Sequence, residues 1–135
     1  MRYPAVAILI ALLIAKSGSA AEHTKDSLDK VKQNLAEKKA ILIDVREKKE
    51  WDDGHLQDAQ LFPLSELKRA STDSELKEKL EKTLPKERII YCHCRSGVRA
   101  LTASDILGKL GYEIRPLAAG FDDLREADFP TAKKK

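Results

Sequence analysis

Apolar residues occur along this chain in two patterns that alternate with each other. Short runs in which nearly every residue is apolar predict strands that are buried on both faces of a sheet. Such runs lie at residues 40–45 and 88–91, and two further short segments, 59–62 and 113–117, are also expected to be strands. Apolar residues spaced three or four apart among charged neighbours predict amphipathic helices. The expected helices lie at residues 24–39, 47–53, 72–84, 103–110 and 121–127.

Capping residues and glycines mark the expected ends of several of these elements. Thr24 or Asp26 can cap the first helix, and Thr72 with Glu75 fits a capping box at the start of the third. Gly54 can end the second helix, because glycine readily adopts the backbone conformation that follows a helix. These signals support the alternation of strands and helices.

Strands that alternate with helices predict an α/β fold. Such strands pair in parallel through right-handed crossovers, so helices should cover both faces of the sheet. A chain of 135 residues suffices for one domain, and it contains no internal repeat. In open α/β sheets ligands bind beyond the carboxyl ends of the strands. We therefore expect Asp44 and Arg46, which end the first strand, to face the same edge as the loop that begins at Cys94.

Residues 1–20 resemble a secretory signal peptide. Arg2 precedes an apolar run from Ala5 to Ala15, and small residues suited to signal-peptidase cleavage follow up to Ala21. The apolar run is shorter than the roughly 20 residues of a spanning helix. We expect cleavage, export to the periplasm or the exterior, no membrane attachment afterwards, and a domain at residues 24–131. The alternative is an uncleaved membrane anchor.

Charge gives little indication of a macromolecular partner. The chain has 25 basic and 22 acidic residues, and removal of residues 1–20 with Arg2 and Lys16 leaves 23 against 22. The terminal lysines 133–135 fit a solvated end better than a nucleic-acid arm. We therefore expect no nucleic-acid binding.

The chain contains two cysteines, Cys92 and Cys94. A disulfide between them would close a small strained ring and stabilise little, so a disulfide scaffold is not expected. Cys92 could resolve an oxidised Cys94, or it could be a small residue that ends a buried strand. With His93 the two thiols would crowd three ligands on adjacent residues, and the sequence has no second cluster to complete a tetrahedral site. No metal is expected.

The segment that follows the third apolar run carries the strongest chemical signal. It consists of Cys94, Arg95, Ser96, Gly97, Val98 and Arg99. Backbone N–H groups of a tight turn that opens a helix converge on one point and favour an anion there. Neighbouring arginines also favour the thiolate, which is the nucleophilic form of cysteine. We therefore predict Cys94 as the nucleophile and residues 95–99 as its binding loop. The alternative is an inert buried thiol.

Three segments resemble the rhodanese family of sulfurtransferases. They are Leu42-Ile43-Asp44-Val45-Arg46, Glu50-Trp51-Asp52-Asp53-Gly54-His55-Leu56, and the loop Cys94 to Arg99. The likeness extends from about Ser27 to Pro130, and it departs from the family at Ala119, Leu124 and Asp128, where glycine, tryptophan and glycine are common. These three departures affect the prediction of substrate preference more than the prediction of catalytic competence.

The resemblance implies a mainly parallel five-stranded sheet between two layers of helices, and sulfur transfer through a persulfide on Cys94. Thiosulfate or a similar small anion would be the donor, and cyanide or a thiol would be the thiophilic acceptor. No metal or organic cofactor is implied. In an exported protein Cys94 would have to be kept reduced or persulfidated, and a redox partner protein could do this.

Two other functions stay open. The related phosphatases have one more residue in the loop, which makes room for phosphate. The four residues between Cys94 and Arg99 therefore favour sulfur over a phosphatase or arsenate reductase on the same fold. A non-catalytic interaction module is the other alternative.

Supporting roles can be proposed for several side chains. Arg99 could hold an anionic donor by paired hydrogen bonds, or it could brace the loop through an ion pair with Asp44. Arg95 should face solvent and steer anions. Asp44 and Arg46 could pair with each other and fix the neighbouring loop.

Two histidines and a tryptophan are assigned structural roles. His55 follows a glycine in a segment typical of the family, which favours hydrogen bonding over acid–base catalysis. His93 should point away from Cys94, because neighbours on a strand face opposite sides of the sheet. Trp51 is expected to be a packing residue.

Overall fold

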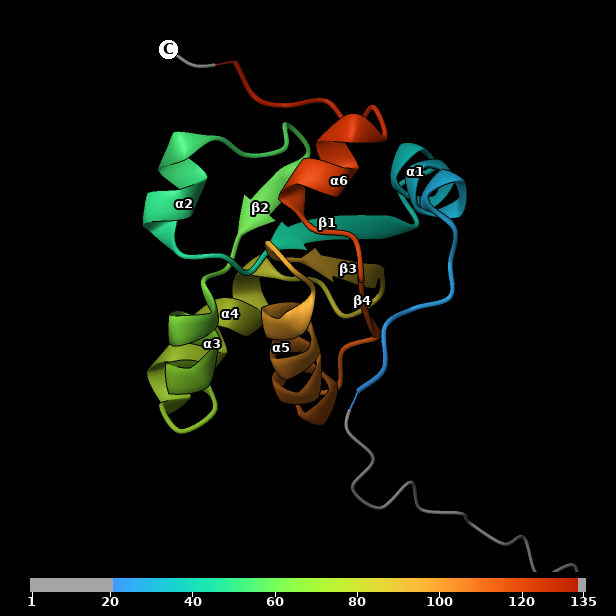
Figure 1. The fold of residues 1–135 in the computed structure, drawn as a ribbon. Coiled ribbons are helices and arrows are strands. Elements are labelled where there is room, and N and C mark those ends of the chain that lie inside the picture. The colour runs from blue at the N-terminus through green and yellow to red at the C-terminus, as the bar shows by residue number, and fades with distance from the viewer. Residues whose placement is uncertain (1–20, 134–135) are drawn as a thin grey trace, which may run out of the picture.

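The computed structural model describes residues 21–133, so the expected signal peptide and residues 134 and 135 lie outside the described part. The chain alternates between strands and helices (Figure 1). The strands are β1 (Ala40–Asp44), β2 (Ala59–Leu61), β3 (Ile89–His93) and β4 (Ile114–Pro116). The helices are α1 (Leu28–Ala36), α2 (Lys48–Asp53), α3 (Leu64–Ala70), α4 (Ser74–Thr83), α5 (Val98–Lys109) and α6 (Phe121–Glu126). Within residues 21–133 no helix is long and apolar enough to cross a bilayer.

The sheet is parallel throughout and has the strand order β2-β1-β3-β4. It has four strands within the described residues, whereas the family resemblance implied five. The four segments predicted as strands from the sequence correspond to these four strands. Leu56 and Thr131 form only an isolated antiparallel bridge, because the pairing of these two loops is too short to make a strand.

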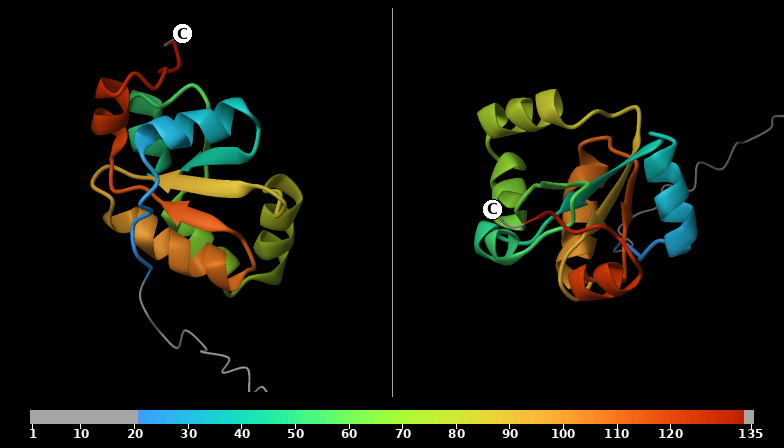
Figure 2. Two further views of the ribbon diagram at one scale, coloured as in Figure 1. Left: turned by 90° about the vertical axis from the view of Figure 1, so that its right-hand side faces the viewer. Right: turned by 90° about the horizontal axis from the view of Figure 1, so that it is seen from above.

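Helices cover both faces of the sheet, as the α/β pattern predicted (Figures 1 and 2). On one face α1 and α6 pack on strand residues such as Leu42 and Tyr91. On the other face α3, α4 and α5 pack on Ile43, Ile90 and Cys92. Successive residues of each central strand therefore enter opposite cores, which is why these strands are apolar without interruption.

Helix α3 was not predicted from the sequence. Leu64, Leu67 and Ala70 form its buried stripe at the helical spacing of three, while its other face is charged and exposed. The helix begins directly after Pro63, which was interpreted only as the end of the preceding strand. Seven residues give too few helical repeats for periodicity alone to identify such an element.

Two predicted N-caps were wrong by one residue or more. Ser27 caps α1 through its hydroxyl, and Asp26 instead accepts a hydrogen bond from the Tyr91 hydroxyl. Asp73 caps α4, because its carboxylate accepts from two N–H groups of the first turn, whereas the Thr72 hydroxyl donates to the preceding helix. In both places several capping residues are adjacent, and tertiary contacts decide which one caps.

Tyr91 links the centre of the sheet to the start of the chain. Its hydroxyl accepts from Asn34 Nδ2 at 2.9 Å and donates to Asp26 Oδ2 at 2.6 Å. Tyr91 and Asn34 are almost fully buried, so each polar group depends on the other for hydrogen bonding. The hydroxyl therefore fixes α1 and the segment before it against β3.

Replacement Tyr91→Phe should lower the free energy of unfolding by about 1–3 kcal/mol, because the buried Asn34 amide loses its partner. Urea denaturation measures the loss. The double variant Tyr91→Phe/Asn34→Leu should recover part of it, since no polar group is then left unpaired. Equal stability of Tyr91→Phe and the parent protein would contradict this account.

Candidate active site

The candidate site lies where β1 and β3 end side by side. In the parallel register Asp44 pairs with His93, and the Val45 N–H donates to the His93 carbonyl at 3.0 Å. Cys94 follows β3 directly, and Arg46 lies two residues beyond the end of β1. The topology thus brings the two polar segments to one edge of the sheet, where open α/β folds bind ligands.

Cys94 is fully buried, and its sulfur faces a backbone donor. The Gly97 N–H donates to Cys94 Sγ at 3.0 Å. Gly97 is the N-cap of α5 and has a φ of 89°, which favours glycine. A Cβ there would also lie 3.0 Å from the Ala118 carbonyl oxygen, so space and conformation both require glycine. The sulfur therefore accepts a hydrogen bond at the positive end of a twelve-residue helix.

The back of the loop is held by the start of α6. The Phe121 N–H donates to the Cys94 carbonyl at 3.0 Å. A Cβ on Gly120 would lie 1.7 Å from the Arg95 carbonyl oxygen, so only glycine allows the two backbones to approach this closely. These contacts fix the chain on both sides of the sulfur.

The other predicted binding residues face outward. Arg95 and Ser96 are exposed, and the Val98 side chain is 66% exposed. Their side chains do not enclose the sulfur, so their contribution to binding lies in the backbone or in the charge of Arg95.

Arg99 is bound by Glu50 of α2. The two side chains form a bidentate pair, with Nη1–Oε1 at 2.5 Å and Nη2–Oε2 at 2.9 Å. The expected alternative partner, Asp44, is wrong, because Asp44 is occupied by Arg46. Hydrogen bonding from Arg99 lowers the pKa of Glu50 from 4.5 to about 2 and raises the pKa of the guanidinium. Glu50 is a site residue that the sequence analysis did not identify, although it lies in the second family segment.

Asp44 and Arg46 form a buried ion pair beneath the loop. Arg46 donates to the carboxylate from Nε and from Nη2 at 2.8 Å, and its backbone N–H donates to the same group at 2.9 Å. Nη2 also donates to the Gly54 carbonyl at 2.7 Å. The pair therefore connects the end of β1 to the end of α2.

His93 lies next to this pair and is fully buried. Its Nε2 is 3.7 Å from Asp44 Oδ2 and has no hydrogen-bond partner among the described residues. Burial lowers the pKa of the imidazole, which keeps it neutral near pH 7.

Cys92 has a different environment from Cys94. Its thiol donates to the Ala100 carbonyl at 3.4 Å, and burial raises its pKa strongly. Both thiols are free. Cys92 therefore has the properties of a structural thiol, and nothing around it favours a thiolate.

The second family segment packs beside the site. The rings of Trp51 and His55 are stacked with centroids 3.6 Å apart, and His55 Nδ1 is 3.0 Å from the Trp51 carbonyl. These contacts give both side chains a structural role.

A shallow depression of about 190 Å³ opens at the edge of the loop. It is lined by Arg46, Glu50, Asp53, Arg95, Phe121 and Asp122. The Arg46 guanidinium lies 4.4 Å from the centre of the Phe121 ring. Charged groups of both signs thus surround this depression, and Arg95 is the loop residue among them.

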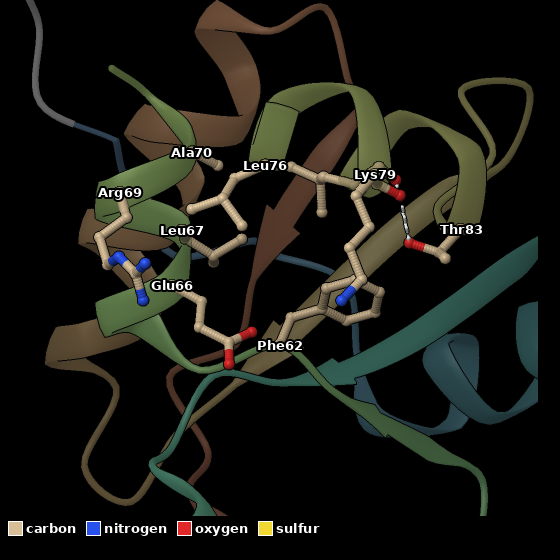
Figure 3. Close-up of a pocket in the computed structure, with 9 residues that line it drawn as sticks. Phe62, Glu66, Leu67, Arg69, Ala70, Leu76, Lys79 and Thr83 are labelled. Atoms are coloured by element: carbon tan, nitrogen blue, oxygen red, sulfur yellow. Dashed lines mark hydrogen bonds between the residues drawn. The ribbon is translucent and has the colours of Figure 1, made fainter. Parts of the chain in front are cut away.

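A second cavity, of about 140 Å³, lies between α3 and α4 (Figure 3). Phe62, Leu67 and Leu76 contribute apolar surface, and Glu66 and Lys79 lie at its rim. None of the predicted site residues lines it. It is smaller than the roughly 300 Å³ of typical ligand pockets. In residues 21–133 no group of three or more His, Cys, Asp or Glu side chains is placed to hold a metal ion.

Comparison with known proteins identifies the family. The family model "Rhodanese-like domain" matches residues 27–127, which is more than half of the chain. A Schizosaccharomyces pombe protein named "Putative thiosulfate sulfurtransferase, mitochondrial" is 36% identical over 87 residues, which cover 61% of this chain and 60% of that protein. The match thus spans about 60% of the length of this curated relative.

Solved structures share the fold. The human single-domain sulfurtransferase TSTD1 superposes with a TM-score of 0.62 and 26% identity, covering 81% of this chain and 97% of its own. A rhodanese-related protein from Thermoplasma volcanium has a TM-score of 0.59 and 25% identity, with 78% and 94% covered. The family match over residues 27–127 agrees with the parallel sheet and with the loop at Cys94. The chain therefore belongs to the rhodanese family of sulfurtransferase-like domains.

Proposed function

We propose that this protein transfers sulfane sulfur through a persulfide on Cys94. The observation that carries the proposal is the hydrogen bond from the Gly97 N–H to Cys94 Sγ at the start of α5. A sulfur that accepts an N–H at the positive end of a helix is stabilised as an anion, either as thiolate or as persulfide. The sulfurtransferase names of its relatives support the same chemistry.

The proposed reaction has two displacement steps. The Cys94 thiolate attacks the outer sulfur of thiosulfate, a new S–S bond forms, and sulfite leaves with the electron pair of the broken S–S bond. A thiophilic acceptor, cyanide or a thiol, then attacks the outer sulfur of the persulfide. The S–S bond of the persulfide breaks, and its electron pair stays on Cys94 Sγ as the thiolate. Both steps balance without an external oxidant, reductant or cofactor.

The charges around the loop suit anionic reactants. Arg95 is exposed beside the depression at the edge of the loop and steers anions toward the loop, while the Gly97 N–H stabilises the charge on sulfur. Arg99 acts through Glu50: its bidentate pair holds the end of the loop, and its donors are already engaged by the carboxylate. We therefore assign Arg99 to bracing the loop.

We also propose that residues 1–20 direct export and are removed. The basis is the sequence pattern alone: an apolar run after Arg2, followed by small residues. N-terminal sequencing of protein produced in a secreting host should find a chain that begins close to Ala21. Recovery of the intact N-terminus from the exported fraction would contradict this proposal.

Replacement Cys94→Ser should abolish sulfur uptake from thiosulfate, because the hydroxyl is a far weaker nucleophile than the thiolate. Mass spectrometry of the protein after incubation with thiosulfate should show one added sulfur in the wild type and none in Cys94→Ser.

Cys92→Ser is the matched control, since it changes the other thiol two residues away. It should take up sulfur like the wild type. Uptake by Cys94→Ser, or none by the wild type, would overturn the proposal. Hydrolysis of a phosphate ester that depends on Cys94 would instead identify a phosphatase.

Replacement Glu50→Gln should lower the rate of sulfur transfer roughly fivefold to tenfold, because Arg99 loses its anionic partner and the end of the loop loosens. Steady-state kinetics with thiosulfate and cyanide measure the effect. Asp52→Asn is the control: Asp52 lies on the same helix and pairs with the exposed Lys48. Equal losses in both variants would show that only the charge of α2 matters.

Stability at acidic pH should also depend on Glu50. Its folded-state pKa is lowered to about 2, so the stabilisation is fully present above the ordinary value of 4.5 and is lost as the pH falls toward 2. The difference in free energy of unfolding between wild type and Glu50→Gln should therefore shrink over this interval. Urea denaturation at several pH values tests this, and a difference independent of pH would contradict it.

A further inference from the structure

A segment before α1 packs along the sheet edge and reaches the Cys94 loop. We call residues 21–26 the N-terminal strap; they precede the region matched by the family model. The strap runs beside β4 (Figures 1 and 2). The Thr24 N–H donates to the Pro116 carbonyl at the end of β4, at 2.8 Å. The Ala21 N–H donates to Asp105 Oδ1 of α5, at 3.1 Å.

The other end of the strap is anchored by a carboxylate. Asp26 Oδ2 accepts from the Tyr91 hydroxyl at 2.6 Å and from Arg115 Nη1 at 2.7 Å. The hydrogen bond from Tyr91 and that from Arg115 lower the pKa of Asp26, so the carboxylate stays charged near neutral pH. The strap is thus attached to β3, β4 and α5 by bonds that do not involve His23.

His23 contacts the loop residue that faces the sulfur. Its Nε2 lies 2.9 Å from the Gly97 carbonyl oxygen. Because a carbonyl oxygen can only accept, Nε2 carries the proton and donates it. A Cβ on Gly97 would lie 2.9 Å from the same nitrogen, so the imidazole occupies the space that the glycine leaves free.

This contact fixes the orientation of the loop backbone. In a trans peptide the C=O and the N–H point in opposite directions. With the Gly97 carbonyl held by His23, the N–H of Val98, the first residue of α5, points in the opposite direction within the same peptide plane. The adjacent Gly97 N–H is the group that binds Cys94 Sγ.

We propose that His23 is a positioning residue of the Cys94 loop, and that the N-terminal strap sets the reactivity of Cys94 by holding the Gly97 backbone. Without the imidazole, Gly97 is free to rotate its flanking peptides, since glycine tolerates a wide range of backbone angles. The sulfur then loses part of its N–H donation. The inference rests on Cys94 being the reacting thiol of the proposed function, and it does not depend on the identity of donor or acceptor.

The test uses alkylation of Cys94 by iodoacetamide as a function of pH, in the full chain with Cys92→Ala so that Cys94 is the only thiol. His23→Ala should slow alkylation at pH 7 about fivefold, the rate equivalent of a hydrogen bond of about 1 kcal/mol, and should move the midpoint of the pH profile upward.

His23→Gln keeps an N–H donor at a similar distance from the backbone and should restore both the rate and the midpoint. His23→Asn is too short to reach Gly97 and should behave like His23→Ala. Lys25→Ala changes an exposed residue of the same strap and should match the parent. Urea denaturation of each variant checks that the fold is retained.

An alkylation profile of His23→Ala equal to that of the parent would overturn the inference, and so would a Gln variant as slow as the Ala variant. If His23→Ala unfolds, the comparison of His23→Gln with His23→Asn decides in the same way. Failure of thiosulfate to load Cys94 while alkylation still depends on His23 would reject the proposed donor and leave the positioning role intact.

Discussion

The parallel pairing of β1 with β3 is the constraint on which the site depends. It places the end of one strand, with its buried Asp44–Arg46 pair, beside the start of the loop that carries Cys94. Both strands are buried on both faces, so a shift in register by one residue would exchange the residues of the two cores. Stability of the whole sheet therefore fixes the position of the sulfur, and the loop only has to orient the groups around it.

Three separate elements then hold the loop. Glu50 of α2 binds its far end through Arg99, the start of α6 binds the Cys94 carbonyl, and the strap binds the Gly97 carbonyl through His23. Each contact comes from a different direction and from a different part of the chain. Donors that are fixed before an anion arrives need no reorganisation when charge develops, which is the physical basis of electrostatic stabilisation in active sites.

The sequence predicts the elements better than their contacts. Continuous apolar runs identify the central strands β1 and β3, because burial on both faces restricts nearly every position of these strands to apolar residues. The pairing of Arg99 with Glu50 leaves no such local pattern, since 49 positions separate the two residues. Asp128 is an intermediate case: it has a φ of 67°, which explains why glycine is common there in the family, but the residue itself does not reveal that angle.

The two cysteines show how the direction of a hydrogen bond separates neighbouring thiols. Cys92 and Cys94 lie two residues apart and are both buried in the same core. Cys92 meets a carbonyl, to which only a protonated thiol can donate, whereas Cys94 meets an N–H, which favours the anion. Both partners belong to the start of α5: the N–H comes from its N-cap, and the carbonyl comes from its first turn.

A Cys92 thiol that is stabilised in its protonated form would be a weak nucleophile toward a persulfide on Cys94, two residues away. The buried position of Cys92 is therefore explained by packing, and Cys94 is the thiol whose surroundings suit the proposed sulfur chemistry.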